Sequence, residues 1–169
     1  METTAESKNC VLNADAISRK IRRMALEVAE QNPDEKDIII AGINGNGEIL
    51  AALLMEELKK VKGFHIHYTT IRLNKKDPVN IELDKSMDLN GKMVLLTDDV
   101  ANSGRTMLFA LKPLLNARPK KIQTLVLVER SHKLFPIQTD YKGLSISTTL
   151  QEHISVETEG KKITGAWLY

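Results

Sequence analysis

Short, uninterrupted apolar runs alternate along the chain with longer stretches in which apolar residues recur every three or four positions. Residues 37–41, 93–96 and 122–128 contain such runs, which are typical of strands buried on both faces of a parallel sheet. Residues 64–71 add a run in which ring and aliphatic side chains alternate, as they do in a strand. We therefore predict an α/β fold with an open, mostly parallel twisted sheet flanked by helices.

Helical periodicity fills the spaces between these strands. After Asn13, a favourable N-cap residue, the helical spacing continues until Pro33 ends it. A second amphipathic stretch follows the glycine-rich residues 42–47 and runs through Leu58, and a third begins after Thr106. Each of the last two helices is therefore expected to start from a loop at the carboxyl end of a strand.

Three segments lie outside this alternation. Residues 72–90 are polar and predict either a long flexible loop or a hairpin at the edge of the sheet. Residues 135–169 contain short β-like pieces, which we assign to a small antiparallel addition. We expect residues 1–10 to be disordered and residues 1–169 to form a single domain.

Composition narrows the class of protein. The 169 residues are 42% hydrophobic and 27% charged, which is ordinary for a soluble globular domain, and the net charge of +2 gives no argument for nucleic acid. The single cysteine, Cys10, excludes an intramolecular disulfide and fits a reducing compartment. Apolar runs fall short of the ~20 residues that span a bilayer, and the polar first eight residues do not resemble a signal peptide. We expect a cytoplasmic protein without a membrane partner.

The strongest chemical pattern follows the apolar run at residues 93–96. Two acids, Asp98 and Asp99, close the strand, and a short loop with small and hydroxyl-bearing residues leads into a helix. A loop that opens a helix offers free N–H groups and the positive end of the helix dipole to a phosphate. Ser103 and Thr106 can add hydroxyl donors, and Gly104 permits close approach of the backbone.

The paired acids have two interpretations. In regular strand geometry, Asp98 and Asp99 point to opposite faces. Beside a phosphate site they could accept hydrogen bonds from sugar hydroxyls or hold Mg²⁺ through water. Alternatively, they belong to a solvated turn in which one acid caps the helix. The order of apolar run, acids, small loop and helix favours the first interpretation.

This stretch resembles the phosphoribosyl-diphosphate motif of type I phosphoribosyltransferases, enzymes with a Rossmann-like fold. The resemblance implies that Asp98 and Asp99 are the catalytic acids that contact the ribose hydroxyls. It also implies a 5-phosphate site made of Ala101, Asn102, Ser103, Gly104, Arg105 and Thr106. Asn102-Ser103-Gly104 stands where the family usually has Thr-Thr-Gly or Tyr-Thr-Gly.

The glycine-rich loop after the first strand has a rival interpretation. Its order is G-x-x-G-x-G over residues 42–47, whereas a dinucleotide site requires G-x-G-x-x-G and an acid about 20 residues further on. By the resemblance, this loop binds pyrophosphate through Asn44, Gly45, Asn46 and Gly47. Arg72 would belong to the flexible loop that closes over the reaction in that family.

A closer resemblance extends over residues 11–158, including Val126-Leu127-Val128-Glu129-Arg130-Ser131-His132 and Asp140-Tyr141-Lys142-Gly143. These segments are similar to the family of pyrimidine-operon regulators with uracil phosphoribosyltransferase activity. The resemblance implies transfer of ribose 5-phosphate from phosphoribosyl diphosphate to a nucleobase, uracil or a similar pyrimidine, with release of pyrophosphate. It also implies Mg²⁺ as cofactor, a homodimer or higher homo-oligomer, and Arg130 as a base-binding candidate.

Many members of that family bind attenuator RNA through a basic surface. Candidates for such contacts here are Arg19, Arg22, Arg23, His132 and Lys133, although a basic helix face is also compatible with simple solvation.

Three departures from the family pattern concern charge. Asn44 and Asn46 replace cations of the pyrophosphate loop, Leu73-Asn74 replaces two acids, and Gln138 and Leu144 replace basic residues. Two hypotheses therefore stand: an active phosphoribosyltransferase, and a catalytically weakened regulatory protein that binds nucleotide or pyrimidine-operon RNA.

Overall fold

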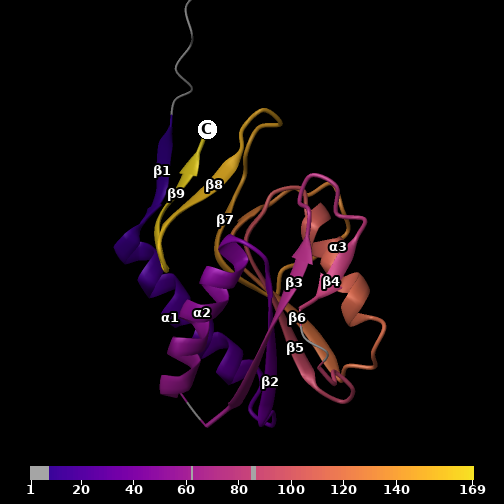
Figure 1. The fold of residues 1–169 in the computed structure, drawn as a ribbon. Coiled ribbons are helices and arrows are strands. Elements are labelled where there is room, and N and C mark those ends of the chain that lie inside the picture. The colour runs from indigo at the N-terminus through magenta and orange to yellow at the C-terminus, as the bar shows by residue number, and fades with distance from the viewer. Residues whose placement is uncertain (1–7, 62, 85–86) are drawn as a thin grey trace, which may run out of the picture.

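A computed structural model describes residues 8–61, 63–84 and 87–169 (Figure 1). Its main sheet has six strands in the order β4-β3-β2-β5-β6-β7, and every neighbouring pair is parallel except β3 and β4. The mostly parallel sheet predicted from the apolar runs is confirmed. The strands are β2 (Asp37–Ile43), β3 (His65–Leu73), β4 (Ile81–Leu83), β5 (Met93–Ala101), β6 (Lys121–Arg130) and β7 (Tyr141–Ile146).

Helices cover both faces of this sheet. Helices α1 (Ala14–Gln31) and α2 (Asn46–Val61) pack on one face, and α3 (Arg105–Leu114) packs on the other (Figure 1). Successive residues of one strand divide between the two cores, since Leu95 packs with α1 and α2 whereas Val94 and Leu96 pack with α3. This division explains why the central strands contain apolar residues at consecutive positions.

The first helix starts where its sequence predicts. The Asn13 side chain accepts a hydrogen bond from the Ala16 N–H at 2.9 Å, which satisfies one of the unpaired N–H groups of the first turn. At the other end, the buried Asn32 donates to the Val28 carbonyl and to the Tyr141 hydroxyl of β7. In the described part of the chain, none of the helices combines the length and the apolar character needed to cross a membrane.

A second, antiparallel sheet contains β1 (Asn9–Asn13), β9 (Lys162–Leu168) and β8 (Ile154–Glu159) in that order. The expected antiparallel addition is therefore present. Residues 1–10 were expected to be disordered, but Asn9 and Cys10 already belong to β1, where they pair with Leu168 and Trp167. Residues 1–7 lie outside the described residues.

One β-like piece lies in a different sheet from the one we expected. The segment ending near Ile146 forms β7, which joins the main sheet parallel to β6 rather than the antiparallel addition. The buried Tyr141 holds it there, since its hydroxyl donates to Gln123 of β6 at 2.8 Å. This pairing depends on residues far apart in the sequence, so the local pattern did not reveal it.

The polar segment at residues 72–90 forms an edge hairpin, the second of its two predicted alternatives. Strand β4 pairs antiparallel with the end of β3, with Arg72 opposite Glu82. Asn74 organises the connecting turn, because its side chain accepts from the Lys76 N–H and its carbonyl accepts from the Asp77 N–H, both at 3.0 Å. Residues 85–86 lie outside the described residues.

Candidate functional site

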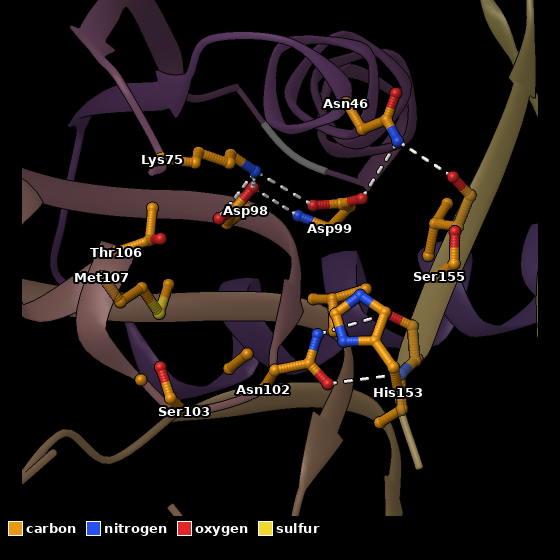
Figure 2. A pocket seen from close by; sticks show the side chains of 15 residues that line it. Asn46, Lys75, Asp98, Asp99, Asn102, Ser103, Thr106, Met107, His153 and Ser155 are labelled. Atoms are coloured by element: carbon orange, nitrogen blue, oxygen red, sulfur yellow. Dashed lines mark hydrogen bonds and ion pairs between the residues drawn. The ribbon is translucent and has the colours of Figure 1, made fainter. Parts of the chain in front are cut away.

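A pocket of about 310 Å³ lies at the carboxyl end of β5 (Figure 2). Four parts of the chain border it: the start of α2, the β3–β4 turn, the loop before α3, and β8 with the residue before it. This is the edge at which parallel α/β sheets bind their ligands. The lining residues are Asn46, Lys75, Asp98, Asp99, Val100, Ala101, Asn102, Ser103, Gly104, Thr106, Met107, His153, Ile154, Ser155 and Val156.

Asp98 and Asp99 lie together in this pocket and are only 1% and 7% exposed. The Lys75 ammonium nitrogen lies 3.0 and 3.3 Å from the two Asp98 carboxylate oxygens, and 3.5 Å from Asp99 Oδ1 (Figure 2). The Asp99 N–H also donates to Asp98 Oδ1 at 2.9 Å. Although neighbouring strand residues ordinarily point to opposite faces, these two carboxylates contact the same cation.

Burial and the neighbouring charges shift the pKa values of Asp98 and Lys75. Burial, reinforced by the neighbouring Asp99 charge, raises the pKa of Asp98 well above its ordinary value, against the attraction of Lys75. Burial lowers the pKa of Lys75, but the two aspartates outweigh it, so the pKa of Lys75 is raised. Lys75 is therefore charged at neutral pH.

The loop from Ala101 to Thr106 has the form of an anion site. Gly104 adopts a φ of +82°, and a Cβ there would lie 2.4 Å from the Ile137 side chain, so this position requires glycine. In the described part of the chain, the N–H groups of Ser103, Gly104 and Thr106 have no protein acceptor. These donors at the start of α3 remain available to a phosphate.

The segment after β6 supports the loop from below. The Ser103 carbonyl accepts hydrogen bonds from the Leu134 and Phe135 N–H groups, both at 3.0 Å. Ser103 Oγ accepts from the Arg105 N–H at 3.2 Å. The Arg105 guanidinium lies 5.9 Å from the centre of the Phe109 ring and is not among the lining residues. Of the six predicted phosphate-loop residues, all but Arg105 line the pocket.

A buried acid anchors this supporting segment. Glu129, 4% exposed, accepts hydrogen bonds from Lys133 at 2.8 Å, from Thr139, and pairs with Lys142 at 3.0 Å. Burial opposes ionisation of Glu129, but these partners overcome it and lower its pKa to about 2. The stem of Lys133 in turn passes beneath Gly104.

The predicted pyrophosphate loop is largely occupied by internal contacts. The Asn44 side chain accepts from the Leu73 N–H at 3.0 Å, and the Gly45 N–H donates to the Glu48 carboxylate at 3.0 Å. Asn46 begins α2, and its side-chain amide donates to Asp99 and to the Val156 carbonyl of β8, both at 3.0 Å. A Cβ on Gly47 would lie 3.1 Å from Asp98 Oδ1. Of these four residues, Asn46 lines the pocket.

Two other predicted residues are engaged elsewhere. Arg72 pairs with Asp84 across the hairpin at 3.0 Å, and the Arg130 guanidinium donates to the Glu152 carbonyl. Neither is among the residues that line the pocket.

The RNA-binding candidates are dispersed over several environments. Arg19 and Arg22 are exposed on α1 and border a separate hollow between α1 and α2. Arg23 donates to the Lys142 and Gly143 carbonyls, and thereby joins α1 to β7. His132 is exposed, whereas the Lys133 ammonium is paired with the Glu129 carboxylate.

Lys75 and His153 also line the pocket, although neither was predicted as a site residue from the sequence. Lys75 belongs to a polar segment in which nothing in the local sequence separates it from Lys76. His153 precedes β8 and pairs with Tyr169 through the backbone, so its place at the pocket depends on how the second sheet folds back.

Comparison with known proteins gives the family. The model of the phosphoribosyl transferase domain matches residues 8–159. The chain is 34% identical to the bifunctional protein PyrR of Bacillus pumilus over 164 residues, covering 90% of this chain and 91% of the relative. It is 35% identical to that of Enterococcus faecalis over 161 residues, covering 90% of each chain.

Solved structures agree on the fold. The hypoxanthine phosphoribosyltransferase of Trypanosoma cruzi has a TM-score of 0.77 at 15% identity and covers 93% of this chain and 95% of its own. A hypoxanthine-guanine phosphoribosyltransferase of Bacillus anthracis has a TM-score of 0.70 at 18% identity, with 82% of each chain covered. The chain therefore belongs to the type I phosphoribosyltransferase family, within which it is similar in sequence to the bifunctional PyrR proteins.

Proposed function

We propose that this protein transfers the ribose 5-phosphate group of phosphoribosyl diphosphate to a uracil-like pyrimidine and releases pyrophosphate. One observation supports the proposal most strongly: two buried carboxylates and a helix-opening loop with unpaired N–H donors share one pocket. The acids suit ribose hydroxyls, which are donors, and the loop suits a phosphate, which is an acceptor. A sugar phosphate presents both groups.

In this proposal each part of the pocket has a separate task. The N–H groups of Ser103, Gly104 and Thr106 bind the 5-phosphate. Asp98 and Asp99 accept from the ribose hydroxyls, orient the sugar and favour the positive character that develops at C1 as pyrophosphate leaves. The residues from His153 to Val156 border the same pocket and could receive the base. Catalysis then rests on positioning and electrostatic stabilisation rather than on a covalent intermediate.

We further propose that Mg²⁺ enters with the substrate. Magnesium sites of this type use one or two carboxylates together with substrate phosphate oxygens and water. Asp98 and Asp99 provide that number of acids, and among the described residues no group of three or more acids, histidines and cysteines is arranged to hold a metal ion. When bound, the ion would neutralise charge on the leaving pyrophosphate.

Calorimetric titration with phosphoribosyl diphosphate and Mg²⁺ tests the proposal. We expect the wild type to bind and the double variant Asp98→Asn/Asp99→Asn to lose at least tenfold in affinity. Asp77→Asn, an exposed acid in the β3–β4 turn, serves as the matched control and should bind as the wild type does. Equal affinities for the wild type and the double variant would reject the ribose role.

A second candidate function has its own observation. The Asn44 side-chain oxygen and the Asn46 amide nitrogen are engaged in internal hydrogen bonds, and the loop contains no cation for a leaving pyrophosphate. A regulatory protein that binds nucleotide or RNA in the absence of turnover would tolerate this arrangement. Incubation of phosphoribosyl diphosphate and Mg²⁺ with a panel of nucleobases distinguishes the two functions, because pyrophosphate release with any base rejects the non-enzymatic one.

A further inference from the structure

Among the described residues that line the pocket, acids outnumber the lysines and arginines. It includes Asp98 and Asp99, with Lys75 as the one lysine or arginine among these residues. Phosphoribosyl diphosphate would bring a phosphate and a diphosphate next to the two acids, where unpaired negative charges repel one another. The loop at residues 44–47 contains no cation to offset this repulsion. Besides the Mg²⁺ proposed to enter with the substrate, the diphosphate side of the pocket therefore needs a positive charge from the protein.

Lys75 lies on that side of the pocket. Its ammonium contacts Asp99 Oδ1 at 3.5 Å, while the Asn46 amide at the start of α2 contacts Asp99 Oδ2 at 3.0 Å (Figure 2). A single carboxylate thus joins the lysine to the first turn of α2. This turn follows the loop that the family resemblance assigns to pyrophosphate, so Lys75 and that loop lie on the same side of the acids.

The hairpin turn holds the backbone of Lys75 but leaves its side chain able to move. Hydrogen bonds from Lys76 and Asp77 to Asn74 order the turn, and the Leu73 N–H ties it to Asn44 at 3.0 Å. The Lys75 side chain is 42% exposed. Its four-carbon stem can therefore carry the ammonium from one oxygen acceptor to another with the hairpin in place.

We propose, on the basis of the phosphoribosyltransferase function above, that Lys75 is the diphosphate-binding cation of this site. The ribose hydroxyls take over as donors to Asp98 and Asp99, and the ammonium moves to the diphosphate oxygens. The exchange keeps every charged group paired, since the carboxylates retain donors and the ammonium gains anionic acceptors. Lys75 thus supplies the charge that Asn44 and Asn46 do not.

Calorimetry with two ligands tests this role. Phosphoribosyl diphosphate carries the diphosphate and ribose 5-phosphate does not, so the ratio of their affinities isolates the diphosphate contact. With Mg²⁺ in excess, we expect Lys75→Met to reduce the preference for phosphoribosyl diphosphate over ribose 5-phosphate at least tenfold. Lys75→Arg should restore most of that preference. Lys76→Met removes an adjacent exposed lysine that does not line the pocket and should behave as the wild type does.

The alternatives give different results. Tighter binding of both ligands by Lys75→Met would mean that the lysine competes with the ribose hydroxyls for Asp98 and Asp99. That result would overturn the proposal. An equal loss of affinity for both ligands would mean that Lys75 contributes only to the overall charge of the pocket. That result would also overturn the proposal. Lys75→Gln, which keeps a donor to Asp98, provides a second neutral variant if the methionine variant unfolds. Failure of the wild type to bind either ligand would reject the phosphoribosyltransferase function itself, and this inference with it.

Discussion

Asp98 is a residue whose proposed task conflicts with the stability of the fold. Its carboxylate is 1% exposed, and burial together with Asp99 raises its pKa well above the usual value. A carboxyl group whose pKa rises on folding binds its proton more tightly in the folded state. Its ionisation therefore lowers stability progressively as pH rises above the unfolded pKa of 3.8. Such a cost is typical of residues retained for binding rather than for folding.

Asp98→Asn should therefore stabilise the protein while it weakens substrate binding. Asparagine preserves the shape and removes the buried charge, and Lys75 can turn to solvent or stay with Asp99. We expect the melting temperature at pH 7 to rise by about 2–4 °C, the shift that roughly 1 kcal/mol produces in a chain of this size. Circular dichroism at pH 7 and pH 5 measures the effect, which should shrink at the lower pH.

Two comparisons make this prediction specific. Asp77→Asn, at an exposed position in the β3–β4 turn that also contains Lys75, should leave the melting temperature unchanged. A lower melting temperature for Asp98→Asn at pH 7 would mean that the ion pair with Lys75 outweighs the burial of the acid.

Gly104 shows how far a single residue can be interpreted from sequence. The sequence indicated that a glycine in this loop would let the backbone approach a phosphate. The structure adds two reasons: a φ of +82°, which is a local property of the loop, and the position of Ile137, whose side chain leaves no room for a Cβ at residue 104. Ile137 lies on a different segment, so the second reason was inaccessible to pattern analysis.

At the scale of elements, the segment at residues 131–139 supports the loop at residues 101–106, for which we propose phosphate binding. Glu129 holds Lys133 and Thr139, and the Leu134 and Phe135 N–H groups hold the Ser103 carbonyl. The geometry of the anion site thus depends on a charge buried at the end of β6.

The Glu129 cluster predicts a distinct pH dependence of stability. Its pKa is lowered on folding from 4.5 to about 2, so the stabilisation is complete above pH 4.5 and is lost as pH falls through the window from 4.5 to 2. The shift corresponds to something on the order of 3 kcal/mol at neutral pH. Urea unfolding at pH 7 and pH 3 should show Glu129→Gln less stable than the wild type at pH 7, by an amount that diminishes at pH 3.

Glu159→Gln, at an exposed position in β8, provides the control and should change stability little at either pH. A deficit for Glu129→Gln that stays the same at both pH values would assign the effect to packing rather than to the ionised carboxylate.

Most elements could be predicted because their signals are local. Asn13 caps α1, and the apolar runs became β2, β5 and β6. Strand β7 was harder, since its own sequence does not show that it pairs in parallel with β6, and its anchor Asn32 is remote in sequence. The polar hairpin was predicted only as one of two alternatives, because β4 is a short edge strand with few buried positions.

At the scale of the whole molecule, the antiparallel sheet closes one side of the pocket. Asn102 exchanges two hydrogen bonds with the Ile154 backbone, at 3.2 and 3.3 Å, and Asn46 donates to the Val156 carbonyl. Two asparagines, one at the start of α2 and one after β5, thus attach β8 to the site. Through β8 they also attach β9 and β1, in which the described part of the chain begins.

Asn102→Ala should loosen this attachment without unfolding the main sheet. Loss of the two hydrogen bonds should speed hydrogen exchange of β8 amides, including that of Ile154, about tenfold, which corresponds to roughly 1.4 kcal/mol of local opening. Amides of β2 and β5 provide the internal control and should exchange at wild-type rates. An equal acceleration in those strands would indicate global destabilisation, and unchanged exchange in β8 would refute the attachment.

By itself, the sequence determined the buried parallel strands, the helix starts, and the acid pair followed by a small loop that opens a helix. These features are encoded by neighbouring residues, because strand burial, helix capping and loop conformation are short-range properties. Tertiary structure alone decided that Lys75 meets Asp98 and Asp99, that Asn46 and Asn102 hold β8, and that Glu129 supports the loop. Each of these contacts joins separate elements, and the identity of a polar residue does not specify which distant partner the folded chain brings to it.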